Sequence, residues 1–128
     1  MRKPHPFTVF LLVSAAVLVQ CCLVVAVGAG AGTVAYLRGD LEAVEAKDIN
    51  TVYEAAKNAV KQLELTVTKD TKDAMSAVII ARDAEDKKIT ITLKAATEDT
   101  TKISVRVGTF GSETKSRRIY DQIKENLR

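Results

Sequence analysis

From Ile89 to Lys94 the sequence alternates strictly between apolar and polar side chains, and this alternation constrains the fold more than any other feature. The same period of two recurs from Ile103 to Val107, and an apolar run extends from Met75 to Arg82. Residues two apart lie on one face of a β-strand, so these runs predict strands with one apolar and one polar face. The polar turns between them are too short for a crossover, so the strands must be antiparallel.

Two more strands are expected nearer the N-terminus. Residues 63–68 alternate with the same period, and the polar residues 69–73 predict a turn after them. Leu41 and Ala43 alternate with their neighbours more weakly, which predicts one strand within residues 36–47. The expected apolar face holds Leu65, Val67, Ile91, Leu93, Val105 and Val107, and the polar face holds Thr66, Thr90, Thr92, Lys94, Ser104 and Arg106.

Helical spacing marks two segments of the chain. Between residues 49 and 63 apolar side chains recur every three or four positions, and Asp48 or Asn50 can cap this helix. A second helix is expected after Gly111 and Ser112. Its apolar positions are Ile119, Tyr120, Ile123 and Leu127.

These elements fit one fold class. An antiparallel sheet with one polar face must bury its other face, and two amphipathic helices can cover it. We therefore predict an α+β two-layer sandwich: an antiparallel four- to five-stranded sheet with two helices on one face, in the order β-α-β-β-β-β-α, preceded by an apolar N-terminal leader. Gly108 and Gly111 bracket the last strand-to-helix turn, and Phe110 is expected to fill the core beneath it.

The leader has the pattern of a lipoprotein signal. Arg2 and Lys3 precede a short apolar run, and Cys21 follows it. Leu18 stands three residues before this cysteine, as in the signals of secreted lipoproteins, whereas Gln20 departs from their usual small residue. We expect a signal segment at 1–20, lipid attachment at Cys21 with Cys22 as second choice, a Gly/Ala-rich tether at 21–35 and an α/β domain at 36–128.

Two alternatives to the lipid anchor stay open. Residues 7–27 could form an uncleaved helix, which at 1.5 Å per residue spans roughly 30 Å, the thickness of the bilayer core. Cleavage after Ala31 would instead release the domain. All three readings keep Arg2 and Lys3 on the cytoplasmic side. The expected location is therefore the bacterial cell envelope, with an anchored domain on the outer, periplasmic or extracytoplasmic side.

The composition argues against several functions. The one histidine is His5, and both cysteines lie at positions 21 and 22, so the expected domain has no imidazole or thiol for Ser-His, Cys-His or zinc chemistry. The glycines of residues 27–33 lack the Gly-Lys-Ser/Thr of a phosphate loop. Carboxylates such as Asp83, Glu85 and Asp86 are expected as solvated turn residues. We expect no enzyme, no cofactor, no metal site and no small-molecule substrate.

Two surfaces are candidates for binding. If alternate residues of the strand at 75–82 face the core, Val78 and Ile80 lie on the polar face and could contact an envelope protein. The last helix carries excess positive charge, which could contact anionic lipid or polymer, although a solvated face with cations near the helix C-terminus is the more common explanation. Beyond Arg2 and Lys3 the chain is close to neutral and has no aromatic platform, so nucleic acid is not expected. The basic residues concerned are Lys115, Arg117, Arg118 and Lys124.

Three stretches carry a resemblance to a known family. They are the Gly-Ala run into residues 33–36, the segment VYEAAK at 52–57, and TKISVRVGTFG at 101–111, the most specific of the three. On these residues the chain resembles a family of small bacterial envelope proteins, a domain of unknown function described mostly as lipoproteins. The resemblance implies an exported, membrane-anchored α/β domain without an assigned activity. The sequence thus predicts a non-catalytic envelope protein that presents a small binding or assembly domain.

Overall fold

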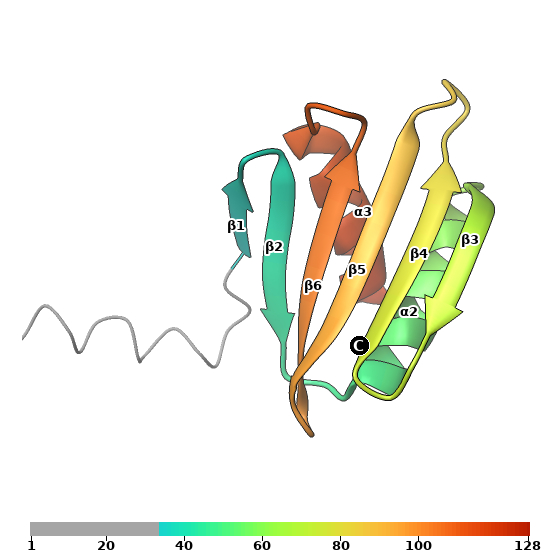
Figure 1. Ribbon diagram of the computed structural model, residues 1–128. Helices are drawn as coiled ribbons and strands as arrows, with labels where there is room; N and C mark the ends of the chain where they lie inside the picture. The colour runs from blue at the N-terminus through green and yellow to red at the C-terminus, as the bar shows by residue number, and fades with distance from the viewer. Residues whose placement is uncertain (1–33) are drawn as a thin grey trace, which may run out of the picture. The chain divides into compact units, whose positions relative to one another are not determined.

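The computed structural model describes residues 34–128, which form one antiparallel sheet with two helices on one of its faces (Figure 1). The predicted α+β sandwich with an antiparallel sheet is confirmed, but the predicted four to five strands are wrong, since the sheet has six. The elements in chain order are β1 (Val34–Leu37), β2 (Asp40–Glu45), α2 (Ile49–Gln62), β3 (Thr66–Lys72), β4 (Ser76–Arg82), β5 (Lys88–Thr97), β6 (Thr100–Val107) and α3 (Glu113–Glu125).

The extra strand comes from a hairpin within residues 36–47. The strands lie in the order β1-β2-β6-β5-β4-β3, so β1 forms one edge of the sheet. Arg38 and Gly39 both have positive φ, 52° and 89°, and join β1 to β2 in a two-residue turn. Left-handed backbone at both central positions is what tight hairpin turns require. One strand was expected here because β1 is too short to show an alternation of its own.

The other edge strand, β3, also differs from the prediction. Residues 69–72, expected as a turn, continue the strand, and every residue of β3 is exposed. The turn lies later: Asp73 accepts hydrogen bonds from the backbone N–H groups of Met75 and Ser76. Val67 lies on the expected face, opposite the buried Ala81, but its side chain is 48% exposed because β3 is an edge strand.

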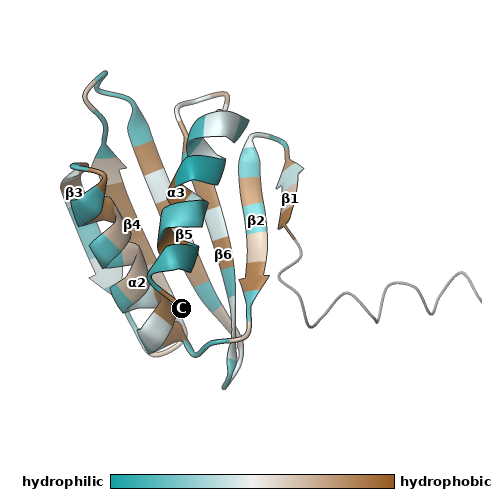
Figure 2. Ribbon diagram, turned by 180° about the vertical axis from the view of Figure 1, so that it is seen from behind, coloured by the Kyte–Doolittle hydropathy of each residue, from teal (hydrophilic) through white to brown (hydrophobic). Residues whose placement is uncertain are grey.

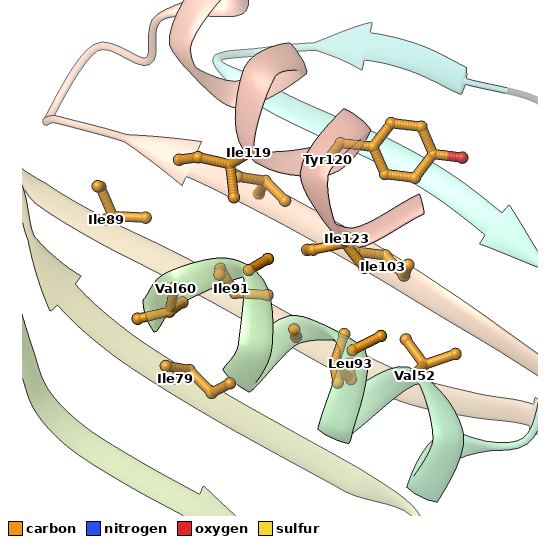
Figure 3. Packing of buried hydrophobic residues seen from close by; sticks show 14 of the residues in the cluster. Val52, Val60, Ile79, Ile89, Ile91, Leu93, Ile103, Ile119, Tyr120 and Ile123 are labelled. Atoms are coloured by element: carbon orange, nitrogen blue, oxygen red, sulfur yellow. The ribbon is translucent and has the colours of Figure 1, made fainter. Parts of the chain in front are cut away.

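Both helices form where the spacing predicted them. Asp48 caps α2 by accepting hydrogen bonds from the N–H groups of Asn50 and Thr51, while Ser112 precedes α3. The side chains that the two helices bury meet the strands in a single core (Figure 3). Figure 2 shows the polar outer surfaces of both helices, with apolar bands on the strands beneath them. The largest fully buried side chains are Tyr120, Leu41, Ile79, Ile89, Ile91, Leu93, Ile103, Ile123, Val52, Val60, Val105 and Val107.

Phe110 does not enter this core. Its side chain is 92% exposed in the loop between β6 and α3, so the expectation that it fills the space beneath the turn is wrong. Ile119 and Tyr120, about two turns into α3, occupy the core instead. The loop leads the chain over the end of the sheet, and Gly108 and Gly111 at its ends have φ of 74° and 83°.

The predicted signal at 1–20, the alternative helix at 7–27 and the two cysteines lie outside the described residues. Of the tether expected at 21–35, residues 34 and 35 are described, and both belong to β1. Neither described helix is both long and apolar enough to cross a bilayer.

Candidate functional site

The face of the sheet opposite the helices, called the open face here, is not covered by any described helix or strand (Figure 1). Figure 1 views the sheet from this side, with both helices behind it. Successive side chains of a strand point to opposite faces, so the residues that flank the buried ones in sequence lie on the open face. Many of these residues carry a hydroxyl group. The hydroxyl residues of the face are Thr66, Thr71, Ser76, Thr90, Thr92 and Ser104.

Val78 and Ile80 lie among these hydroxyl residues, on β4. Val78 stands directly between Thr92 of β5 and Thr71 of β3, and Ile80 has Thr90 as its β5 neighbour. Both side chains are half-buried, whereas the residues between and beside them, such as Ile79, are fully buried on the helix side. The predicted orientation of these two residues is thus observed. They form a small apolar patch within a polar face.

The open face is basic although the chain as a whole is nearly neutral. Six cationic side chains alternate with core residues and therefore point to this side, against the two carboxylates of Asp40 and Glu42. Both carboxylates are already paired: Asp40 with Arg106 at 3.2 Å and Glu42 with Lys102 at 3.0 Å. The six cations are Lys69, Arg82, Lys88, Lys94, Lys102 and Arg106.

Two like-charge pairs stand on neighbouring strands of the open face. Lys94 is the direct cross-strand partner of Lys102, and Arg82 is the partner of Lys88. Like charges placed directly opposite one another destabilise a sheet. Arg82 is relieved by an ion pair with Asp86, but Lys69, Lys88 and Lys94 have no carboxylate within 4.0 Å among residues 34–128. The repulsion within these pairs lowers the stability of the sheet locally, and the unpaired cations make the open face positively charged.

The four basic residues predicted on the last helix do not act as one group. Lys115 lies between the carboxylates of Asp83 and Glu85 in the β4–β5 turn, and Arg117 pairs with Glu113 at 3.1 Å. Hydrogen bonds from Lys115 lower the pKa of both carboxyls, and the carboxylates raise the pKa of the Lys115 ammonium in turn. Within the described residues, Arg118 and Lys124 have no such partner, so half of the predicted basic surface is internally neutralised.

A shallow groove adjoins this ion-pair cluster. It encloses about 400 Å³ between the end of α2, the β4–β5 turn and α3. Apolar side chains, among them Leu65, Ile89 and Ile119, line it, and Lys115 and Arg118 stand at its rim. The groove is open to solvent. The Lys115 ammonium beside it is already paired with the carboxylates of Asp83 and Glu85. Among the residues that the structure describes, no cluster of carboxylates could hold a metal ion.

At one end of the sheet the β1–β2 turn and the β6–α3 loop pack backbone against backbone. A side chain on Gly39 would reach 2.7 Å from the carbonyl oxygen of Phe110, and a side chain on Gly111 would overlap the Gly39 backbone. Arg106 links the same two loops by donating hydrogen bonds to the carbonyl oxygens of Arg38 and Thr109, at 3.2 and 2.7 Å. Sequence reasoning identified Gly111 as a turn residue but not its packing against Gly39, since the two lie far apart in the chain.

Comparison with known families covers almost the whole chain. Residues 6–126 match the family described as "Protein of unknown function (DUF3568)". The chain belongs to this family. The predicted membership in a domain-of-unknown-function family is thereby confirmed, and the DUF3568 match includes all the strands and helices described above. No curated protein matches the chain. The envelope location and the lipid anchor stay predictions.

Proposed function

We propose that this DUF3568 member is a non-catalytic, membrane-anchored protein of the bacterial envelope, which binds a partner protein through the open face of its sheet. The anchor is a lipid on Cys21, and the domain stands on the outer side of the membrane. The observation that carries the proposal is the open face itself: six strands wide, uncovered by any described residue, and basic in a chain that is otherwise nearly neutral.

The charge of the face indicates the chemistry of the partner. Lys69 and Lys94 project from it without a carboxylate of their own within the described residues, and Lys94 faces Lys102. A partner with an acidic surface would relieve this repulsion, and charge complementarity of this kind favours specific and fast association. The half-buried pair Val78 and Ile80 on β4 supplies a small apolar contact within this basic face. A few well-packed side chains usually carry most of the binding energy of an interface.

Charge reversal tests which face binds. The protein is cross-linked in cells as the full chain, and the cross-linked complexes are compared between variants. Lys69→Glu/Lys94→Glu is expected to abolish the complex, because it turns the basic face towards neutrality. The matched control is Arg118→Glu/Lys124→Glu, which reverses two exposed cations on α3.

The two variants also separate the proposal from its alternative. In the alternative, α3 binds an anionic lipid or polymer surface and the chain is held by a single-pass helix. Loss of complexes in the α3 variant, with the sheet variant unchanged, would contradict the open face as the interface and favour the alternative. Loss of the complex in the sheet variant alone would support the proposal.

The anchor has its own test. The intact mass of the protein extracted from native membranes is expected to lack residues 1–20 and to carry a diacylglyceryl-sized addition. An unmodified full-length mass would contradict the lipid anchor and indicate the uncleaved helix at 7–27.

A further inference from the structure

The loop tip at one end of the sheet presents the most exposed large apolar side chain of residues 34–128. Phe110 is 92% exposed, and Leu37, at the end of β1 in the adjoining hairpin, is 58% exposed. Phe110 lies in the loop beyond β6, outside the open face that the proposed function uses for its partner. Leu37 stands opposite Asp40 on the edge strand β1, at the outermost corner of that face. An aromatic ring held almost entirely in water is unfavourable, since burying it elsewhere would release apolar surface from contact with water.

Close backbone contacts hold the two loops of the tip together. Gly39 and Gly111 let the hairpin turn and the β6–α3 loop approach so closely that no side chain fits between them. The hydroxyl of Tyr36 also lies against Gly111. Arg106 then donates hydrogen bonds to both loops and pairs with Asp40 at 3.2 Å. These contacts hold the backbone on both sides of Phe110 in the conformation that leaves its ring exposed.

Two cationic residues belong to the segments that adjoin the Phe110 loop. Arg38 belongs to the hairpin turn that packs against Phe110, and Lys88 accepts the backbone hydrogen bond of Gly108 at 2.8 Å. Arg38 and Lys88 have no carboxylate within 4.0 Å among the described residues. The carboxylates nearest in sequence to the two loops, Asp40 and Glu113, are each held by an arginine.

We propose that this tip, with Phe110 at its point and Arg38 and Lys88 beside it, inserts into the interface of an anionic lipid bilayer. Phenylalanine side chains of membrane-surface segments bury at the boundary between headgroups and acyl chains, and lysine and arginine beside them are attracted by anionic lipid. The pattern of one outward ring, a second exposed apolar residue and unpaired cations fits a lipid surface. It does not fit an apolar protein groove, because such a groove would need a longer ridge of apolar side chains.

The tip can reach the membrane if the chain is anchored as proposed. The thirteen residues from Cys21 to Val34 span at most about 45 Å when extended. The tip lies beyond the four residues of β1, roughly 14 Å from Val34. Contact with the membrane through this tip alone would leave the rest of the open face accessible to a partner protein.

The absence of tryptophan from the chain allows a direct test. Phe110→Trp places the chain's single tryptophan, which can be excited selectively over its three tyrosines, at the tip of the full-length protein, reconstituted into vesicles of phosphatidylcholine with or without phosphatidylglycerol. We expect its emission to shift to shorter wavelength, and brominated lipid to quench it, in the anionic vesicles. The matched control is Met75→Trp, because Met75 is 63% exposed in the turn at the opposite end of β4 and should stay in water.

Further variants separate the components of the proposal. Arg38→Asn/Lys88→Gln in the Phe110→Trp protein is expected to return the emission to that of lipid-free protein, while Lys69→Glu/Lys94→Glu should leave it shifted. The proposal is overturned if the position-110 probe behaves like the position-75 probe in anionic vesicles. A shift that depends on protein concentration without vesicles would also overturn it, since it would indicate a second copy of the chain as the occupant. Neither result depends on whether the open face binds a partner.

Discussion

The hydroxyl of Tyr120, in α3, donates a hydrogen bond to the carboxylate of Glu45, the last residue of β2. Tyr120 is otherwise fully buried, and burial, together with this carboxylate, raises its pKa above the usual range of a tyrosine. The bond joins the last helix to a strand that lies 75 residues earlier in the chain. The C-terminal helix is therefore held by a directed contact as well as by packing.

Removing this hydroxyl should cost stability. Tyr120→Phe keeps the shape of the core but leaves Glu45 without its donor, so we expect the free energy of unfolding to fall by about 1–2 kcal/mol. Tyr53→Phe is the matched control. Tyr53 donates to the carboxylate of Asp70, which raises the tyrosine pKa to about 12, but this bond lies on the surface and its loss should cost less. Urea denaturation of both variants measures the difference, and equal losses would contradict the role given to the buried bond.

The backbone contact between the two loops predicts a difference between two glycines. Gly108 and Gly111 both have positive φ, and alanine at either position should cost roughly 1–2 kcal/mol for its backbone conformation. A side chain at Gly108 would meet no atom within 4 Å, whereas one at Gly111 would overlap Gly39. Gly111→Ala is therefore expected to destabilise the protein clearly more than Gly108→Ala in denaturant titration. A smaller effect at Gly111 would mean that the loops do not pack in this way.

The ion-pair cluster of Lys115 predicts a dependence of stability on pH. Asp83 and Glu85 have lowered pKa values in the folded state, so their contribution is present above their unfolded pKa values, near 4, and is lost as the pH falls through the lowered values. Lys115→Gln should therefore lower the melting temperature at pH 7 and have little effect at pH 2. A melting temperature lowered equally at both pH values would show that Lys115 contributes through packing and not through its charge.

The repulsion on the open face predicts a variant that loses binding without losing stability. Lys94→Glu replaces a cross-strand lysine pair by an opposite-charge pair with Lys102. We expect a melting temperature that is unchanged or a few degrees higher. Lys102 already pairs with Glu42, which limits the gain. Thermal denaturation checks this, and a clear decrease would mean that Lys94 supports the fold.

The sequence predicted those parts of the fold in which a core-facing side chain recurs regularly. Strands β4, β5 and β6 bury every second residue, and both helices bury every third or fourth. The predicted ranges of these five elements were close to those observed. Strand β3 was shortened because its residues 69–72 are charged or polar, and an exposed edge strand carries no apolar alternation. The hairpin at Arg38 and Gly39 was missed because a glycine in a weakly alternating segment does not show where a turn falls.

The candidate sites depended more strongly on tertiary structure. The orientation of Val78 and Ile80 followed from strand alternation alone. The basic character of the open face could not be predicted, since it arises when strands distant in sequence place Lys69, Lys94 and Arg106 on one side. Phe110 was assigned to the core on hydrophobicity, whereas the approach of Gly39 to the loop decides its position. The pairing of Lys115 with the β4–β5 turn was likewise not visible in the sequence.

The central claim, that the open face is the partner-binding surface, is tested most directly by a photo-cross-linking residue in intact cells. The residue is placed at position 92, in the centre of the open face, and separately at position 124 on α3. The account predicts a discrete cross-linked protein from position 92, absent in the Lys69→Glu/Lys94→Glu background, and none from position 124. Cross-linking from position 124 with none from position 92 would contradict it.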